Sequence, residues 1–128
     1  MNIKFMTALL ALSFSLSAQA NEPPKIDGWT FLSGSDRYLE YGKSGSARLT
    51  NGTRIMLVQV VPSSGSSDQR VDYKKFTISD KDCKAGYGVV RFYSLSGELS
   101  STVDYVQGGS SIAAGAADIL CSVKFDQN

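Results

Sequence analysis

The sequence predicts an α+β fold, in which a single antiparallel sheet of about six strands is packed by one C-terminal helix and fastened by one disulfide. Three observations carry this prediction. Past the first 20 residues the chain is rich in Ser, Gly, Val and Tyr, which favours strands and turns over helices. Asn51-Gly52 separates two strand-like runs. The segment SSIAAGAADILC, residues 110–121, repeats apolar residues at helical spacing.

The first 20 residues have the pattern of a cleaved secretory signal peptide. A lysine precedes an apolar run from Phe5 to Leu16, and small residues follow at Ala18 and Ala20. The run is too short to cross a ~30 Å hydrocarbon core. We therefore expect an exported protein that begins at Asn21 and lies in the periplasm, outside the cell or at the cell surface. A lipid anchor is not expected, because no cysteine follows the cleavage point.

Past this leader, residues 21–28 form a polar arm with two prolines, and residues 29–126 form one domain. The strand-like segments of the domain alternate apolar and polar residues or are rich in β-branched and aromatic side chains. These segments are 29–32, 37–41, 46–50, 53–61, 71–79, 87–95 and 98–106.

The clearest local signal is Asn51-Gly52. A two-residue type I′ turn needs positive φ at both central positions, which Asn and Gly tolerate, so 46–50 and 53–61 should pair as a hairpin. The second of these strands, Ile55 to Val61, is apolar on both faces apart from Gln59. Such a strand is usually central and covered on both sides.

Two connections and one helix complete the expected elements. Residues 63–69 are a flexible loop by composition, and residues 81–86 should form a turn. Ser110 or Ser111 suits a helix N-cap. The residues that recur on one helical face, and that we expect to meet the sheet, are Ile112, Ala116, Ile119 and Val123. The alanines make the helix small-faced, so that it can lie close to the sheet.

The chain has two cysteines, Cys83 and Cys121, and no histidine. In an oxidising compartment two such cysteines most often form a disulfide, and this one should stabilise the fold by about 4 kcal/mol in the chain-entropy model. A metal site needs more ligands than these, so we expect neither metal nor cofactor.

The charge balance and the missing motifs exclude several function classes. The chain has 13 basic and 12 acidic side chains, and removal of Lys4 with the leader balances them. A balanced charge gives no general attraction to nucleic acid or to anionic membranes. A serine nucleophile would have no histidine base, and neither a G-x-S-x-G elbow nor a phosphate loop is present. We therefore expect a protein that is not an enzyme.

Three groups of residues are candidates for a site, and each has an ordinary structural interpretation. A basic cluster could bind an acidic partner, but the interleaved aspartates favour a mixed solvated surface; the basic residues are Arg70, Lys74, Lys75, Lys81 and Lys84. Aromatic residues could line a ligand groove or pack as cross-strand core pairs; these are Trp29, Tyr87, Tyr93 and Tyr105. Asp80 and Asp82 lack the spacing of a calcium loop, and a turn before a strand explains them.

The order of these elements resembles the surface-adhesin protein E domain of Gram-negative bacteria, over about 95 residues from Trp29 to Lys124. The residues that carry the resemblance are Trp29, Tyr38-Leu39-Glu40-Tyr41, Arg54-Ile55-Met56-Leu57-Val58, Lys81-Asp82-Cys83, Ser110-Ser111-Ile112 and Ile119-Leu120-Cys121. The resemblance implies an antiparallel sheet packed by a helix with one disulfide. It also implies an adhesin-like role, in which the domain binds host proteins such as extracellular matrix components.

Two function classes follow from these observations. The first is an exported, adhesin-like binding module for host or envelope macromolecules. The second is a periplasmic interaction protein such as an inhibitor or immunity protein. The apolar strand Ile55 to Val61 implies that the sheet face away from the C-terminal helix needs a cover, for which the candidates are the arm, a second copy of the chain or a protein ligand.

Overall fold

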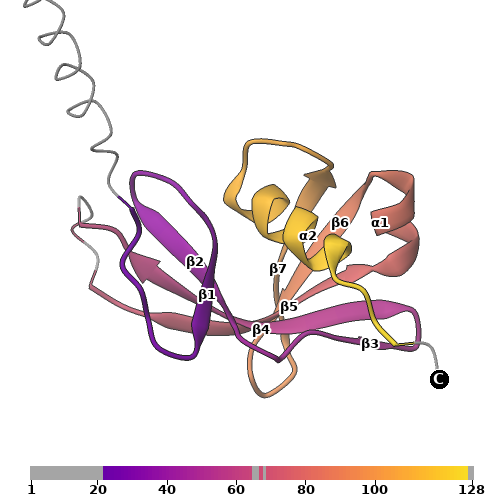
Figure 1. The fold of residues 1–128 in the computed structure, drawn as a ribbon, viewed down its shortest axis with the longest axis horizontal. Helices are drawn as coiled ribbons and strands as arrows, with labels where there is room; N and C mark the ends of the chain where they lie inside the picture. The colour runs from indigo at the N-terminus through magenta and orange to yellow at the C-terminus, as the bar shows by residue number, and fades with distance from the viewer. Residues whose placement is uncertain (1–21, 65–66, 68, 127–128) are drawn as a thin grey trace, which may run out of the picture.

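The computed structural model describes residues 22–64, 67 and 69–126. The predicted leader and its cleavage point lie outside these residues, as does part of the predicted loop 63–69. The fold is α+β, with one antiparallel sheet of seven strands and a C-terminal helix, as predicted (Figure 1). The elements in chain order are β1 (Trp29–Gly34), β2 (Tyr38–Lys43), β3 (Arg48–Thr50), β4 (Thr53–Pro62), β5 (Asp72–Ser79), α1 (Asp80–Ala85), β6 (Tyr87–Tyr93), β7 (Leu99–Val106) and α2 (Ile112–Ser122).

The sheet runs in the order β1-β2-β4-β5-β6-β7, and the short strand β3 pairs with the first residues of β4. The Asn51-Gly52 turn joins β3 to β4, with φ of 50° at Asn51 and 78° at Gly52. Both central residues therefore have the positive φ that a type I′ turn requires, and the predicted hairpin is confirmed.

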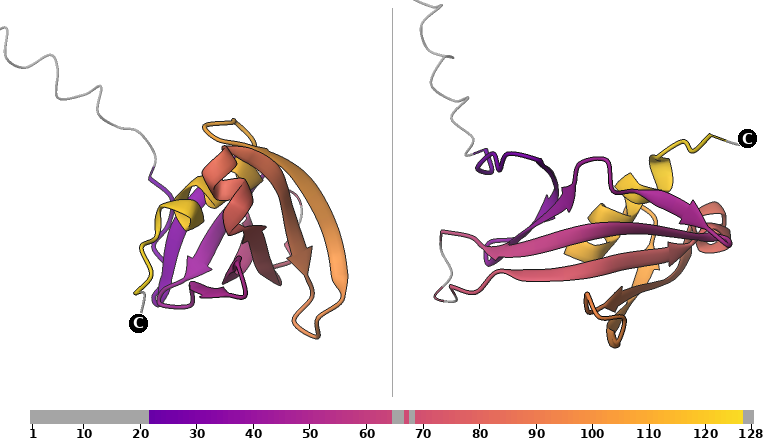
Figure 2. Two further views of the ribbon diagram at one scale, coloured as in Figure 1. Left: turned by 90° about the vertical axis from the view of Figure 1, so that its right-hand side faces the viewer. Right: turned by 90° about the horizontal axis from the view of Figure 1, so that it is seen from below.

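The sheet is strongly curved, and α2 lies inside the curve. Figure 2 (left) shows β1 and β7 on opposite sides of α2, and α2 contacts both of these strands. We call the sheet surface that holds α2 the concave face and the opposite surface the convex face. The core is on the concave face, where side chains of β4, β5, β6 and β7 pack against the helix; its largest buried members are Phe76, Ile78, Val90, Tyr105 and Leu120.

The helix contacts the sheet through a face that shares Ala116 with the predicted one but is otherwise made of other residues. Its buried residues are Ala113, Ala114, Ala116, Ala117 and Leu120. Ile119, which the spacing assigned to the buried face, is 38% exposed. Because the sheet wraps around the helix, small side chains fit between α2 and the sheet. The bulkier isoleucines lie at the margin of this contact, where Ile112 is half-buried and Ile119 is exposed. A Cβ on Gly115 would come within 2.6 Å of the Ser33 hydroxyl, which shows how closely α2 and β1 approach.

The predicted turn at residues 81–86 is instead a short helix, α1. The Ser79 hydroxyl caps its N-terminus by accepting from the Lys81 N–H, and Gly86 ends it with φ of 84°. At the second helix the predicted cap is found, since the Ser111 hydroxyl accepts from the Ala114 N–H at 3.0 Å.

The central strand β4 is covered unequally on its two faces. Met56 and Val58 are buried under α2, whereas Ile55, Leu57 and Val61 on the convex face are half-buried. Within residues 22–64, 67 and 69–126 both helices lie on the concave side, so the convex face has no helix over it (Figure 2, right). The arm, one of the three covers expected for this face, does lie against it. Neighbouring aromatic side chains and the arm provide what cover there is.

Candidate functional site

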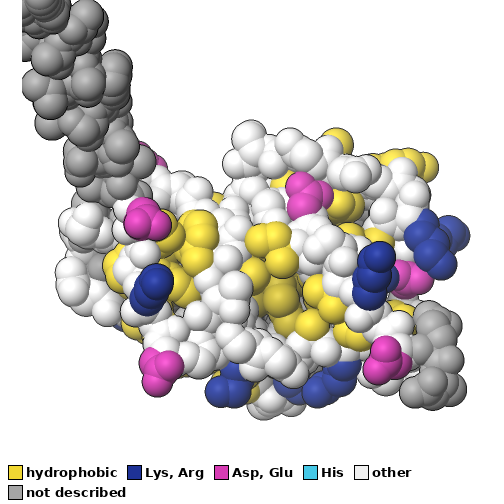
Figure 3. All heavy atoms as spheres, in the orientation of Figure 1, with side chains coloured by type: hydrophobic (Ala, Val, Ile, Leu, Met, Phe, Trp, Pro, Cys, Tyr) yellow, Lys and Arg dark blue, Asp and Glu magenta, His cyan; other side chains and the backbone are white. Residues whose placement is uncertain are grey.

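Four aromatic side chains form a cluster on the convex face, which we call the aromatic patch. Its members are Trp29 and Phe31 from β1, Tyr41 from β2 and Tyr73 from β5. The rings of Phe31 and Tyr41 meet edge to face with centroids 5.6 Å apart, and those of Trp29 and Tyr73 lie 6.0 Å apart. Figure 3 shows hydrophobic side chains at the surface over β1 and β2, beside the arm.

The strand register brings these rings onto one surface. In the β1–β2 pair Trp29 lies opposite Lys43 and Phe31 lies opposite Tyr41, and in the β4–β5 pair Gln59 lies between Tyr41 and Tyr73. Paired residues of an antiparallel sheet point to the same face, so the row crosses four strands without leaving the convex side. Gln59 beneath the row is 5% exposed.

The arm lies against this patch. The Tyr41 hydroxyl donates to the Pro24 carbonyl oxygen at 2.5 Å, and the Tyr41 side chain is fully buried. Burial also raises the pKa of this phenol, so Tyr41 remains a neutral donor at physiological pH. Two further backbone bonds, from the N–H of Trp29 to Ile26 and from that of Ser44 to Gly28, hold the end of the arm at the sheet.

Two hollows of about 360 and 730 Å³ lie where the arm meets the sheet. Residues 22–24, Ile26, Phe31 and Tyr41 line both of them, and Trp29 lines the larger one. The ammonium of Lys43 is 5.5 Å from the centre of the Trp29 ring, so a cation borders the patch.

The patch is open to a partner at two of its rings. Phe31 is 37% exposed and Tyr73 is 46% exposed. Tyrosine and tryptophan are enriched in protein interfaces, where large rigid rings contribute contact area at a small cost in conformational entropy. The exposed rings of the aromatic patch are therefore of the kind that contacts other macromolecules.

Most of this patch was missed by sequence reasoning. Trp29 was a candidate groove residue, but Phe31, Tyr41 and Tyr73 were not. The alternation of side chains along β5 indicates where Tyr73 points. Tyr73 lies on the same face as Lys75 and Thr77, whereas Phe76 and Ile78 point to the core on the other face.

The other aromatic candidates do not join Trp29. Tyr105 is a core residue of the concave face, and its hydroxyl donates to Asp118 of α2 at 2.7 Å. Burial and this carboxylate raise the pKa of Tyr105 to about 12. Tyr87 is 66% exposed near the far edge of the sheet, and Tyr93 is half-buried. The structure therefore does not form the predicted groove from these residues.

The five basic candidates are not brought together either. Arg70 and Lys74 line a shallow hollow of about 270 Å³ that also contains Asp72. Lys75 points to the opposite face from Lys74, because neighbouring strand residues alternate. Lys81 and Lys84 lie on α1. Figure 3 shows basic and acidic side chains mixed on the face turned to the viewer.

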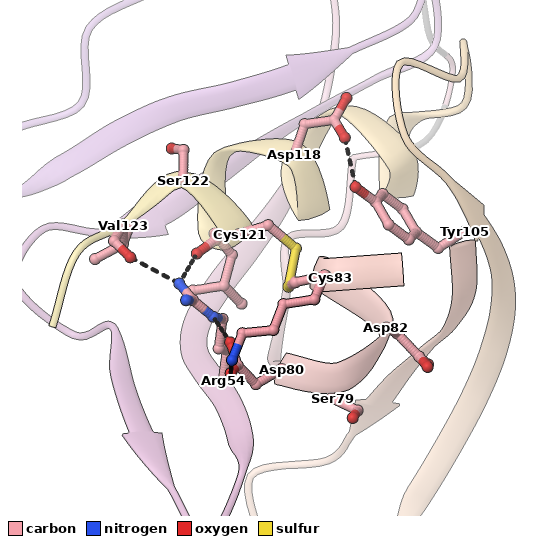
Figure 4. Close-up of a disulfide and its surroundings, with 12 residues drawn as sticks. Arg54, Ser79, Asp80, Asp82, Cys83, Tyr105, Asp118, Cys121, Ser122 and Val123 are labelled. Atoms are coloured by element: carbon pink, nitrogen blue, oxygen red, sulfur yellow. Dashed lines mark hydrogen bonds and ion pairs between the residues drawn. A yellow bond between two sulfur atoms is a disulfide. The ribbon is translucent and has the colours of Figure 1, made fainter. Parts of the chain in front are cut away.

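The two cysteines form the predicted disulfide between α1 and α2, with Cα atoms 5.4 Å apart (Figure 4). No described cysteine is free. Such a bond is typical of proteins exported to an oxidising compartment. Within the described ranges no group of three metal-ligating side chains occurs, and no described helix is long and apolar enough to cross a membrane.

Asp80 and Asp82 serve the structure beside the disulfide. Arg54 donates to the Asp80 carboxylate at 2.8 Å and to the backbone carbonyls of Leu120 and Val123 (Figure 4). The hydrogen bond from Arg54 lowers the pKa of Asp80 most, and the hydrogen bond from Lys84 lowers it further. The Asp82 carboxylate accepts from the Val89 N–H.

A buried carboxyl group, Glu40, was not anticipated from the sequence. It lies on the concave face opposite Val60, is 1% exposed, and its Oε1 atom has no hydrogen-bond partner among the described residues. Burial raises its pKa to about 7. Glu40 is therefore an acid whose charge state can change near neutral pH.

The chain matches no protein-family model, no curated protein and no solved structure. The resemblance to the surface-adhesin protein E domain stays a prediction.

Proposed function

We propose that this chain is an exported, non-enzymatic binding module that engages a protein partner through the aromatic patch. The observation that carries the proposal is the half-exposed pair Phe31 and Tyr73, held on a rigid sheet by ring contacts to Tyr41 and Trp29. A partner that covers these rings would bury their apolar surface, and each Å² buried contributes about 25 cal/mol of favourable free energy.

The class of partner follows from the chemistry of the patch. Aromatic rings bordered by one ammonium group fit the mixed apolar and polar surface of a folded protein. The adhesin-like role implied by the sequence resemblance places this partner in the host matrix or the cell envelope. Protease shaving of intact cells separates a surface adhesin, which is cleaved, from a periplasmic inhibitor or immunity protein, which is protected.

The test is site-specific photo-crosslinking in cells that export the protein. A benzophenone amino acid at Tyr73 should give a covalent adduct with another protein. The matched control is the same amino acid at Tyr87, which is also an exposed tyrosine of the sheet but lies outside the patch. Adducts to other proteins that form equally at both positions, or only at Tyr87, would contradict the proposal.

Substitutions complete the test. Tyr73→Ser should abolish capture of the crosslinked partner while leaving the unfolding midpoint nearly unchanged, because the side chain is nearly half exposed. Joint replacement of Lys74 and Lys75 by Ser should leave capture intact. Loss of capture in the lysine variant alone would instead indicate an electrostatic ligand.

A further inference from the structure

The two edges of the sheet differ in how they are protected against pairing with another strand. At one edge, β1 has an irregular register in its middle, between Phe31 and Ser33, and the arm hydrogen-bonds to its first residue. At the other edge, β7 has eight residues with no proline, no lysine and a single charge, Asp104. Natural proteins use bulges, lysines, prolines and covering segments to prevent pairing at an edge. Among the described residues the β7 edge has no covering arm, proline or lysine, and its one register irregularity, at the Phe92 and Tyr93 pairs, lies at the start of the strand and leaves residues 101–106 as a regular ladder.

The hydrogen-bond pattern shows which residues of β7 point outward. Gln107 and Gly86 are the next opposite residues after the pair Val106 and Tyr87. The Gln107 N–H donates to the Gly86 carbonyl, so Gln107 and Gly86 form a hydrogen-bonded pair, and the pair Val106 and Tyr87 is non-bonded. Bonded and non-bonded pairs alternate in an antiparallel ladder, so Val103 and Tyr105 bond to β6 while Thr102 and Asp104 direct their N–H and C=O groups away from it.

A second contact agrees with this assignment. The hydroxyl of Thr77 on β5 donates to the Arg91 carbonyl, which therefore points toward β5 and away from β7. Arg91 is the β6 partner of Thr102. Thr102 is thus in a non-bonded pair with β6, and its backbone groups face the outer edge. In the described chain no strand lies beyond β7.

We propose that a second copy of this chain pairs with β7 along this edge, antiparallel and about a twofold axis at Val103. The outward groups of each strand then meet outward groups of the other, because Thr102 lies opposite Asp104 of the second copy. An isologous contact of this kind needs a self-complementary strand. The pairing joins two sheets into one and extends the backbone ladder by the outward N–H and C=O groups of both copies.

The side chains of β7 favour this register. It places the carboxylate of Asp104 beside the hydroxyl of Thr102 in the second copy, which can donate to it. It also places Val103 against its own symmetry mate. A twofold axis at Asp104 would set two carboxylates against each other, and like charges directly opposite are destabilising. The aromatic patch lies toward the opposite edge of the sheet, so the inference does not depend on the proposed function.

The first test compares two substitutions of Thr102 by sedimentation equilibrium. Thr102→Pro removes the outward N–H without removing a bond to β6, so the dimer dissociation constant should rise by at least about tenfold. Thr102→Ala keeps the N–H and should stay close to wild type. Circular dichroism checks that both variants retain the fold. The inference is wrong if wild type is monomeric up to about 1 mM, the limit of a weak specific association, or if Thr102→Pro dimerises like Thr102→Ala.

The second test gives a positive signal that does not depend on a loss of binding. Non-bonded antiparallel pairs have Cα atoms about 4.5 Å apart, which suits a disulfide. Val103→Cys should therefore form a covalent dimer under mild oxidation, seen on a non-reducing gel. Val106→Cys, which lies opposite Ser100 in this register, should not. Equal crosslinking of the two variants would overturn the register.

Discussion

The two ends of the sheet are built in opposite ways (Figure 1). At the disulfide end, which holds Arg54, Asp80, Cys83 and Cys121, a covalent bond and a shared guanidinium join β4, α1 and the end of α2. At the arm end, which holds residues 22–28, Glu40 and the aromatic patch, a carboxyl group is buried without a partner on Oε1 and two rings are half-exposed. The disulfide end therefore contributes stability. The arm end has a buried carboxyl oxygen that lacks a hydrogen-bond donor in the described part of the chain and aromatic rings that remain partly exposed to water.

In a small domain, exposed binding groups and stabilising contacts can occupy separate ends of one sheet. A surface that binds needs exposed apolar groups, which lower the stability of the free protein or add nothing to it. A crosslink at the far end of the same sheet can offset that cost without contacting the proposed binding surface.

Replacement of Cys83 and Cys121 by serine should destabilise the domain by about 4 kcal/mol, because the bridge closes a long loop in the unfolded chain. Urea unfolding measures the change. Reduction of the wild-type protein serves as the control and should lower the midpoint equally. A midpoint that both treatments leave unchanged would show that the disulfide end does not dominate stability.

Glu40→Gln should stabilise the domain at pH 8.5 by as much as about 3 kcal/mol. The folded pKa of Glu40 is raised from 4.5 to about 7, so the penalty is absent below pH 4.5, grows between pH 4.5 and about 7, and is level above that. The variant should therefore match wild type at pH 4 and exceed it at pH 8.5 in thermal unfolding. Glu98→Gln, at an exposed position, is the matched control and should have no such effect. Parallel pH profiles of wild type and Glu40→Gln would refute the burial penalty.

Arg54→Met should destabilise the domain by about 2 kcal/mol at pH 7, because two carbonyls and a carboxylate lose their donor. The pKa of Asp80 is lowered in the folded state, so its contribution is present above its unfolded pKa and is lost as the pH falls through the folded value. The variant should therefore also lose less stability between pH 5 and pH 2. Arg48→Met on the exposed side of β3 is the control. Equal melting temperatures for the two variants would contradict the role of Arg54.

Gly52→Val should cost about 1 kcal/mol, the scale of a strained turn position. The φ of Gly52 is 78° and a Cβ there would meet no atom within 4 Å, so the cost isolates backbone strain from steric clash. Gly52→Asn is the control, since asparagine tolerates this conformation better than a β-branched residue. Identical denaturation midpoints for the valine and asparagine variants would show that the strain is absorbed elsewhere.

Local signals in the sequence were enough for the elements that depend on short segments. The Asn51-Gly52 turn, the Ser111 cap and the seven strand-like segments are set by φ preferences, side-chain acceptors and alternation within a few residues. A similar signal was available for α1, because Ser79 precedes Asp82 at the spacing of a capping box. The disulfide followed from the number of cysteines and the compartment that the leader implies.

Curvature of the sheet decided what the local signals could not. The helical spacing of α2 allowed either Ile119 or the alanines to face the sheet, and the closeness of β1 and β7 to the helix selected the alanines. The tertiary structure also buries Glu40, which lies in a polar and aromatic strand, and leaves Tyr73 half-exposed beside Trp29. Each outcome depends on residues far apart in the chain.

The α+β class, the hairpin turn and the pairing of Cys83 with Cys121 could be predicted from the sequence, because they follow from local backbone preferences and because two cysteines allow only one intramolecular pair. Tertiary structure alone decided that the aromatic patch exists and that Glu40 is an acid with a pKa of about 7. The physical reason is that exposure and desolvation are properties of the assembled surface, which forms only when strands distant in sequence lie side by side.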